Sequence, residues 1–248
     1  MQPIYEQNFL VDDLAVDCFG RLKPSMVLYY QQEVAGNHFQ LLEDRNDPIA
    51  GKHLFWAVSR HRVKIHRLPR LGETVRVETW PMPTTRVAYP RAMAMYSLTG
   101  ELLAQSVSLW VLMDAESRAM VLPGKSGVLV EGTQRGTELE VPKSPAVKEL
   151  PRVTTRDVTC SVLDINGHMN NTRYFDWVDD LLDSQFHRAH PVSEFVICYL
   201  NEAREGDRLS LHWGISEDGV LLVDGHREQA EIAEKNSRVF TAQVLFSS

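Results

Sequence analysis

The first half of the chain has the residue pattern of one helix followed by a series of strands. The stretch from Pro24 to Asp44 reads as a helix, and Pro24 suits a first-turn position because its missing N–H costs no hydrogen bond there. The runs that follow are rich in β-branched and aromatic residues, as strands are. They span residues 55–66, 74–81, 86–98 and 102–114, and LTGE forms a turn between the last two.

The second half shows the same order of elements. We expect a helix from about Asn170 to Phe186, with a broad apolar face and a stripe of carboxylates that reads as a solvated face. The apolar face comprises Tyr174, Phe175, Trp177, Val178, Leu181, Leu182 and Phe186, and the stripe comprises Asp176, Asp179, Asp180 and Asp183. Strand-like runs joined by short turns follow, which favours antiparallel pairing. They cover residues 193–203, 207–215, 219–228 and 238–246.

An internal repeat relates the two halves. The stretch DCFGRLKPSMVLYY from Asp17 matches DINGHMNNTRYFDW from Asp164, at an offset of 164 − 17 = 147. Further along, RLGETVRVETW and REGDRLSLHWG superpose Gly72 on Gly206, at an offset of 206 − 72 = 134. The sequence therefore predicts a duplicated α+β unit, in which an antiparallel sheet wraps around a long central helix. The predicted domains are residues 1–125 and 153–248, joined by a linker over residues 126–152 that is rich in proline and glycine.

Composition and charge narrow the class of protein. With 44% hydrophobic and 24% charged residues, the chain has an ordinary globular composition. It has no apolar run of membrane-spanning length, and MQPIYEQNFLVDDL does not resemble a signal peptide, so we expect a cytoplasmic protein. A formal charge of −7 argues against general nucleic-acid binding. Cys18, Cys160 and Cys198 fit neither a disulfide framework nor a zinc site, and we expect no metal or cofactor.

The segment before the second helix carries three hydrogen-bonding side chains, Asp164, Asn166 and His168, at alternate positions. The first turn of a helix offers unpaired N–H groups, so it can stabilise a carbonyl oxygen that gains negative charge. Asn166 can orient a water or a carbonyl, and His168 can exchange a proton near neutral pH. In the alternative interpretation, Asp164 and Asn171 are helix caps and His168 is an ordinary first-turn residue.

The repeat helps to separate these interpretations. At the positions equivalent to Asn166 and His168, the first half has Phe19 and Arg21, whereas the Asp and the Gly of the motif are present in both halves. Glu202 likewise has Leu68 as its counterpart, since 202 − 134 = 68. This comparison suggests that the duplicated unit kept a chemical site in its second copy alone.

Glu202 follows an apolar strand in EFVICYLNEA. If strict strand alternation continues, Val196, Cys198, Leu200 and Glu202 point to the same face. Glu202 is then a candidate general base, with its pKa raised by burial. The alternative is an exposed acid at the end of the strand, within the charged run NEAREGD.

These motifs together resemble those of the acyl-ACP thioesterase family. The segment DINGHMNN resembles its D-x-N-x-H-x-N-N motif, SRHRVKIHRLPRLGETVRVETWP resembles its first-domain stretch, and EFVICYLNEAREGD resembles the strand that bears its catalytic Glu. The resemblance covers nearly the whole chain and implies two tandem hotdog domains that hydrolyse fatty acyl thioesters of acyl carrier protein. It implies catalytic roles for Asp164, Asn166, His168 and Glu202, and it suggests Trp56 and Arg60 for substrate binding.

One position departs from the family pattern. Plant members carry a Cys directly after the Glu, where this chain has Ala203. Cys198 is a poor substitute because it lies four residues before Glu202, which is roughly 13 Å along a strand. The resemblance then implies direct attack by water, in which Glu202 is the base and His168 positions water or the thioester carbonyl, or the reverse.

The sequence specifies the substrate and the partner protein less closely than it specifies the reaction. The first domain is the natural place for the acyl chain, as the resemblance also implies. Strand alternation puts Arg60, Arg62, Lys64 and His66 on one face, which is either a docking patch for acidic carrier protein or merely a solvated face. Two other functions stay open: an acyl-CoA thioesterase of the same fold, and a non-hydrolytic acyl-binding module, for which Ala203 is a clue. The sequence leaves monomer and homodimer equally open.

Overall fold

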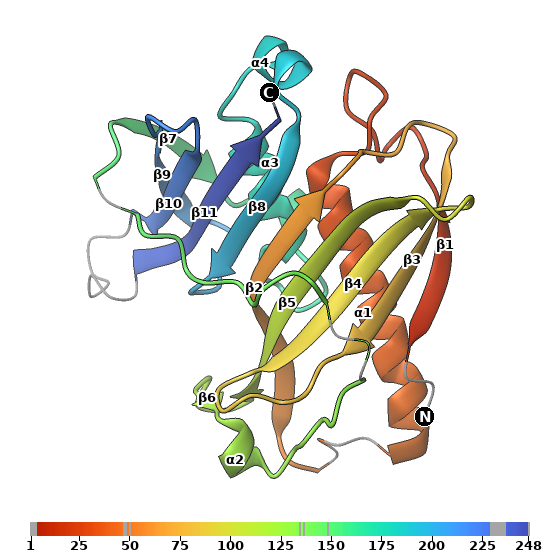
Figure 1. Cartoon of the computed structure of the whole chain (residues 1–248). Coiled ribbons are helices and arrows are strands. Elements are labelled where there is room, and N and C mark those ends of the chain that lie inside the picture. Colours follow the sequence, from red (N-terminus) through yellow and green to blue (C-terminus); the bar gives the residue numbers. More distant parts are fainter. Residues whose placement is uncertain are drawn as a thin grey trace. The chain divides into compact units, whose positions relative to one another are not determined.

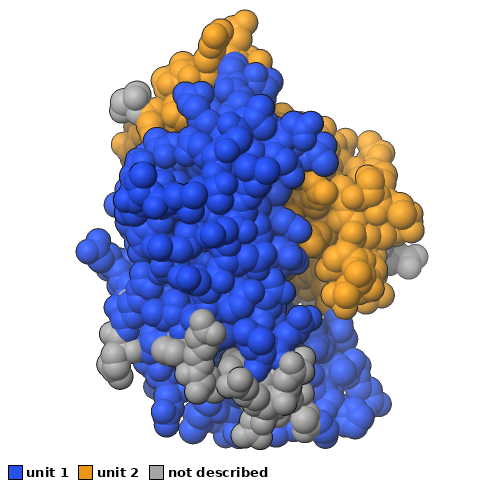
Figure 2. Space-filling view, turned by 90° about the vertical axis from the view of Figure 1, so that its right-hand side faces the viewer, with its two compact units in different colours: residues 1–142 blue, residues 143–248 orange. Residues whose placement is uncertain are grey.

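The chain divides into two compact units, residues 1–142 and 143–248, which we call the first and the second unit (Figure 2). The structure is a computed structural model. It describes residues 4–46, 49, 51–133, 135, 137–147, 149–228 and 237–247, and the side chains of residues 42–46 are not part of the description.

The first unit is an antiparallel sheet that packs on one long helix (Figure 1). Its strands pair in the order β1-β3-β4-β5-β2, with β6 on β5, and α1 packs against β1 and β3. The elements are β1 (Tyr5–Leu10), α1 (Pro24–Asn46), β2 (Leu54–Ile65), β3 (Thr74–Pro81), β4 (Tyr89–Ser97), β5 (Leu102–Asp114), β6 (Met120–Val121) and α2 (Pro123–Ser126).

The second unit repeats this order with shorter helices. Its strands pair antiparallel in the order β8-β11-β10-β9-β7. The elements are β7 (Arg152–Asp157), the 3₁₀ turn η1 (Cys160–Val162), α3 (Asn171–Asp179), α4 (Ser184–Ala189), β8 (Val192–Tyr199), β9 (Arg208–Ile215), β10 (Leu221–Arg227) and β11 (Arg238–Phe246). The prediction of antiparallel sheets, each with a helix before the main strands, is confirmed.

The sequence pattern located the central strands better than the edge strands. Strands β3, β5 and β11 have the predicted bounds, whereas β1 and β7 were not expected. β1 pairs with β3 and β7 pairs with β9, each at one end of the strand order. Both are short, and β7 falls at the end of the stretch that reads as a linker, so neither offered a strong apolar signal.

The expected continuous helix from Asn170 to Phe186 is wrong. α3 ends at Asp179, and a new helix, α4, begins at Ser184. The carboxylate of Asp183 accepts a hydrogen bond of 2.8 Å from the amide of Phe186, so it caps α4 instead of continuing the first helix. The apolar face is nevertheless real in α3, where Tyr174, Phe175, Trp177 and Val178 are all buried.

Aromatic contacts join α3 to its sheet. The ring of Phe175 lies 4.1 Å from that of Phe195 on β8, and Tyr174 meets Phe240 on β11 edge-on at 5.0 Å, measured between ring centroids. Such pairs contribute about 0.5–1.5 kcal/mol beyond the area that they bury. They hold the start of α3, and with it the preceding segment, against the ends of β8 and β11.

The helix-facing layer of the first unit contains polar groups as well as apolar ones. Gln31 of α1 accepts a 2.7 Å hydrogen bond from Ser106, and Arg91 of β4 lies 3.1 Å from the Nδ1 atom of His38. His61 of β2 stands opposite Ser108 in the sheet register and is only 4% exposed. Burial lowers the pKa of His61 from 6.5 to about 3.

This shift makes the protein sensitive to acid through one residue. The unfolded chain takes up a proton on His61 below pH 6.5, but the folded protein excludes it until about pH 3. The stabilising contribution is therefore complete above pH 6.5 and is lost as the pH falls towards 3. We expect His61→Gln to lower the slope of unfolding free energy against pH in this window by up to about 1.4 kcal/mol per pH unit. Urea unfolding at a series of pH values measures the slope, and an unchanged slope would contradict the assignment.

Candidate functional site

A carboxylate organises the turn that precedes α3. The Oδ1 atom of Asp164 accepts hydrogen bonds from the amides of Asn166 at 2.8 Å and His168 at 3.5 Å. The main chain closes the same turn, because the Asp164 amide donates to the His168 carbonyl and the Gly167 amide donates to the Asp164 carbonyl. Gly167 has a φ of +74°, which favours glycine. Asp164 therefore builds the turn, and it does not cap α3.

The first unit contains the same turn at Asp17. There the Oδ1 atom of Asp17 accepts from the amides of Phe19 and Arg21, each at 2.9 Å, and Gly20 has a φ of +70°. The two main-chain hydrogen bonds of the turn are also repeated. The internal repeat seen in the sequence is thus a repeat of hydrogen bonds, and Asp and Gly are the residues on which the turn depends.

Backbone pairing brings His168 and Glu202 together. His168 forms an isolated antiparallel bridge with Arg204, and the amide of Met169 donates to the carbonyl of Ala203 at 2.8 Å. The Nε2 atom of His168 then lies 3.1 Å from the Oε2 atom of Glu202. In the first unit the equivalent bridge joins Arg21 to Arg70. The pairing is common to both units, while the imidazole and the carboxylate belong to the second.

Glu202 does not continue the alternation of β8, so that prediction is wrong. β8 ends at Tyr199, and the amides of Leu200 and Asn201 both donate to the carbonyl of Val239. Two successive residues on one acceptor break the period of two, as in a bulge. The expected burial of Glu202 is also wrong, because its side chain is 39% exposed. It has a second neighbour, Arg204, whose Nη2 atom lies 3.5 Å from the Oε2 atom.

The start of α3 is capped by Asn170, and not by Asn171 as one interpretation held. The Asn170 side chain accepts hydrogen bonds from the amide and the hydroxyl of Thr172. The turn and this cap use most amides of the segment, but the structure gives the amide of Asn171 no acceptor among the described residues. Asn166 is exposed, so its side-chain amide is accessible. These two groups are N–H donors that the segment can offer to a ligand.

No cysteine accompanies the His168–Glu202 pair in the part of the chain that the structure describes. Ala203 is fully buried, and so is Cys198 within β8. Cys18 and Cys160 are exposed and unpaired with each other. The arrangement that the structure brings together is thus a histidine, a carboxylate and amide donors.

Trp56 and Arg60 do not share a surface. The β2–β5 register shifts between Val58 and Arg60, which sets Trp56 opposite Leu112 and Arg60 opposite Leu109, on different faces of the sheet. Trp56 is half-buried and meets Tyr89 edge-on at 4.8 Å, and its indole N–H is buried without an acceptor in the described residues. Arg60 reaches the carbonyl of Pro142 at 3.5 Å. Arg62 and Lys64 follow Arg60 on the same face, as the alternation predicts.

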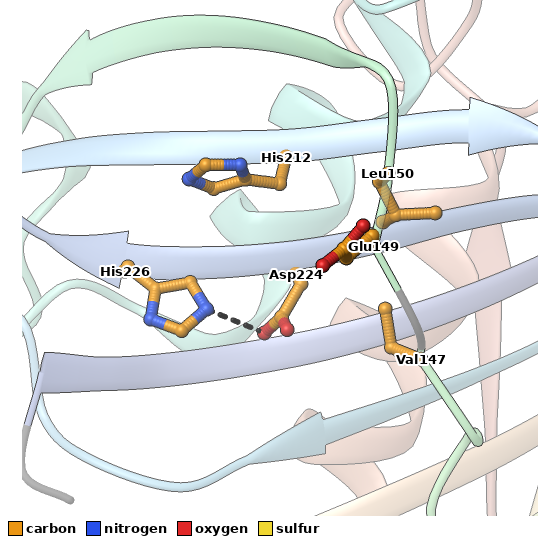
Figure 3. Close-up of a pocket in the computed structure, with 6 residues that line it drawn as sticks. All are labelled: Val147, Glu149, Leu150, His212, Asp224 and His226. Atoms are coloured by element: carbon orange, nitrogen blue, oxygen red, sulfur yellow. Dashed lines mark ion pairs between the residues drawn. The ribbon is translucent and has the colours of Figure 1, made fainter. Parts of the chain in front are cut away.

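A pocket that the sequence did not indicate lies on β9 and β10 of the second unit (Figure 3). None of the four predicted catalytic residues lines it. Asp224 lies 3.1 Å from the Nε2 atom of His226 and 2.7 Å from the Nε atom of Arg238, so its charge is already matched. Within the described residues, no group of three or more His, Cys, Asp and Glu side chains is placed to hold a metal ion. The pocket is lined by Val147, Glu149, Leu150, His212, Asp224 and His226.

Comparison with protein families decides what kind of molecule carries this arrangement. The model of the acyl-ACP thioesterase N-terminal domain matches residues 2–122, and that of the C-terminal domain matches residues 148–242. The chain belongs to the acyl-ACP thioesterase family. The resemblance inferred from DINGHMNN and the other motifs is therefore confirmed.

Relatives from plants share about a quarter of their residues with this thioesterase family member. The chloroplastic oleoyl-acyl carrier protein thioesterase 1 of Arabidopsis thaliana is 24% identical over 225 residues, which cover 82% of this chain and 61% of that protein. The chloroplastic palmitoyl-acyl carrier protein thioesterase of Gossypium hirsutum is 26% identical over 219 residues, covering 80% and 52%. The chain thus spans little more than half the length of these relatives.

Solved structures agree on the fold. An acyl-ACP thioesterase from Bacteroides thetaiotaomicron superposes with a TM-score of 0.86 at 24% identity, covering 99% of this chain and 98% of that one. A 12:0-ACP thioesterase from Umbellularia californica gives a TM-score of 0.80 at 21% identity, covering 100% and 98%. The predicted tandem hotdog fold is confirmed. No helix in the described residues is both long and apolar enough to cross a membrane.

The repeated turn provides a matched pair of variants. Gly20 and Gly167 have the same left-handed conformation, and a Cβ atom at either would meet nothing within 4 Å. Gly20→Ala and Gly167→Ala should each lower the unfolding free energy by about 1–2 kcal/mol, the cost of the left-handed conformation for an alanine. Urea unfolding of the two variants checks this. A loss confined to one of them would contradict the equivalence of the two turns.

Proposed function

We propose that the protein hydrolyses fatty acyl thioesters of acyl carrier protein, releasing a free fatty acid and holo-carrier protein. One observation carries the proposal: His168, on the turn before α3, lies 3.1 Å from Glu202, whereas the equivalent positions of the first unit hold Arg21 and Leu68. The matches to both thioesterase domain models, which together span most of the chain, support the same substrate class. The carrier protein is therefore the proposed partner.

Water is the nucleophile in the proposed reaction. Glu202 accepts a proton from water while the water oxygen forms a bond to the thioester carbon and the carbonyl electrons move to oxygen. His168 positions the water or the carbonyl from its place beside Glu202. Collapse of the tetrahedral intermediate breaks the C–S bond, and the sulfur leaves as a thiol after it takes up the proton. The fully buried Ala203 and Cys198 supply no nucleophile to this scheme.

The developing negative charge on the thioester oxygen needs donors that are already oriented. The amide of Asn171, at the first position of α3, and the exposed side-chain amide of Asn166 are available for this role. Preorganised N–H donors of this kind commonly account for about 2.7–4 kcal/mol of transition-state stabilisation each. Asp164 contributes by holding the turn, because its carboxylate is occupied by main-chain amides.

The acyl chain is assigned to the interior of the first unit. Trp56, Phe39 and Tyr89 form an aromatic group there, with ring edges meeting faces at 4.8 and 6.1 Å. Trp56 is then a substrate-binding residue. On the opposite face of β2, Arg60, Arg62 and Lys64 form the basic strip proposed to attract the acidic carrier protein.

Replacing either member of the pair should abolish most turnover. We expect Glu202→Gln and His168→Ala each to reduce thiol release from acyl carrier protein thioesters by about 10²–10⁴-fold, the usual contribution of a general base. The assay uses a panel of chain lengths from C8 to C18, so that it also reveals the preferred substrate. Leu68→Gln, at the position equivalent to Glu202 in the first unit, is the matched control and should keep wild-type turnover. A fall of only a few-fold in Glu202→Gln would remove the proposed base.

The same assay separates the proposal from its competitors. With one acyl chain on both carriers, we expect faster release from acyl carrier protein than from coenzyme A. The opposite preference would favour an acyl-CoA thioesterase of the same fold. Absence of release from every carrier, with acyl groups retained by the protein, would favour a binding module.

A further inference from the structure

The main chain of Glu202 is held by an arginine from a distant strand. Arg227, the last residue of β10, donates a hydrogen bond from Nη2 to the carbonyl of Glu202. Its Nε atom lies 2.9 Å from the Oδ2 atom of Asp207. Both side chains are largely buried, with exposed fractions of 13% for Arg227 and 12% for Asp207. The contact is close but misaligned for a hydrogen bond at Nε, so it acts as an ion pair.

Asp207 fixes the other end of the same segment. Its carboxylate accepts a 2.9 Å hydrogen bond from the amide of Arg204, and its own amide donates to the carbonyl of Arg204. Its carbonyl accepts from the amide of Val158, which anchors the turn to the chain that follows β7. Arg227 and Asp207 therefore clamp the segment Glu202–Asp207 at both of its ends. We call these two residues the clamp.

Tyr174 of α3 adds a contact between the two ends of the clamp. Its hydroxyl interacts with the amide of Ala203, the residue after Glu202, and both Arg227 and Asp207 are close enough to influence it. Burial raises the pKa of Tyr174 well above its usual value, so the hydroxyl stays neutral. The layer beneath Glu202 is thus built of buried polar groups that all face the main chain.

The main chain at Glu202 needs the support of Arg227 and Asp207 because of its position in the fold. Glu202 lies beyond the end of β8, and the bridge between His168 and Arg204 that pairs its segment is an isolated one. Its carboxylate lies 3.1 Å from His168 and 3.5 Å from the exposed Arg204. A small shift of the main chain would change the balance between them and draw the carboxylate away from the imidazole.

The described residues of the first unit are arranged differently at the equivalent positions. Sheet register pairs Leu209 with Arg227 in the second unit and Val75 with Ser97 in the first, so Ser97 occupies the position of Arg227. Glu73, the counterpart of Asp207, is paired instead with Arg67 at 2.9 Å, from the chain after β2. Arg67 is 39% exposed and is also paired with Glu101. Among the described residues, the buried arginine that reaches the carbonyl occurs in the unit that has Glu202, and not in the unit that has Leu68.

We propose that Arg227 is a positioning residue for thioester hydrolysis, which together with Asp207 fixes the main chain of Glu202 so that its carboxylate stays beside His168. This inference rests on the proposed function, because it assigns Arg227 to the same reaction. Arg227 acts through Glu202 and has no contact with the substrate in this scheme.

The test combines single variants with a double-mutant cycle. We expect Arg227→Gln to lower kcat for the preferred acyl carrier protein thioester by about tenfold or more, as misplaced groups do, with KM changed by less than about twofold. Arg227→Lys keeps a cation for Asp207, but it has one nitrogen in place of the guanidinium fork that serves Asp207 and the Glu202 carbonyl together, so it should be intermediate. In a Glu202→Gln background, Arg227→Gln should change the residual rate by less than about twofold, because the group that it positions is already disabled.

The matched control is Arg238→Gln. Arg238 also lies on a strand of the second unit and pairs with an aspartate, Asp224, at 2.7 Å, but its side chain makes no contact with Glu202 among the described contacts. It should keep wild-type kcat while it loses a comparable ion pair. Thermal unfolding of all variants shows whether each is folded at the assay temperature.

The outcomes distinguish the clamp from the proposed function. Wild-type kcat in Arg227→Gln, or losses that multiply fully in the double variant, would overturn the positioning role even though the enzyme hydrolyses its substrate. Failure of the wild-type protein to release thiol from any carrier would instead overturn the proposed function. A kcat loss of similar size in Arg238→Gln would show that any broken ion pair in the unit has this effect, and it would also overturn the proposal.

Discussion

One aspartate carboxylate that accepts main-chain amides fixes the geometry on which the candidate site depends. In the second unit Asp164 holds the amides of Asn166 and His168, and the turn then pairs with the segment that follows β8. Without that pairing, His168 and Glu202 are separated by the whole length of α3, α4 and β8. The carboxylate thus converts a large separation in sequence into a contact of 3.1 Å between two side chains. Its stabilising contacts are local, but their consequence is long-range.

Two copies of one scaffold separate the residues that the shared turn requires from the residues that differ between the units. Asp17 and Asp164, with their glycines, make the same main-chain hydrogen bonds in both units. Other residues of the two turns differ. The ion pair of the segment that pairs with each turn also differs: Arg67 pairs with Glu73 in the first unit, and Arg227 pairs with Asp207 in the second. Differences inside a shared framework are informative because folding requirements are the same on both sides of the comparison.

Sequence reasoning succeeded where the signal was local or repeated. The strands β3, β5 and β11 followed from their composition, and the comparison with the first half singled out His168 and Glu202, whose side chains the structure places 3.1 Å apart. It failed where a single hydrogen bond decided the outcome. The cap formed by Asp183 divided a helix that periodicity had joined. The shared acceptor at Val239 moved Glu202 out of the strand pattern and into a partly exposed position.

The role inferred for Arg227 lies beyond what the sequence could indicate, since nothing local distinguishes it from other arginines at strand ends. Its relation to Glu202 depends on sheet register across β9 and β10, which only the structure supplies. Trp56 and Arg60 are a second example. They are four residues apart, so strict strand alternation would put them on one face, but a register shift of one residue places them on opposite faces. The sequence therefore failed mainly to indicate the register between paired strands.

The turn at Asp17 is held by the main-chain N–H groups of its third and fifth residues, Phe19 and Arg21, and the Arg21 side chain adds one further hydrogen bond to the carboxylate. The two copies of the turn already differ at these positions, since the second carries asparagine and histidine where the first carries phenylalanine and arginine. The first unit therefore contains a turn of the same geometry without the asparagine and the histidine. A designer who wished to install new reactivity would have a template for it 147 residues away in the same chain.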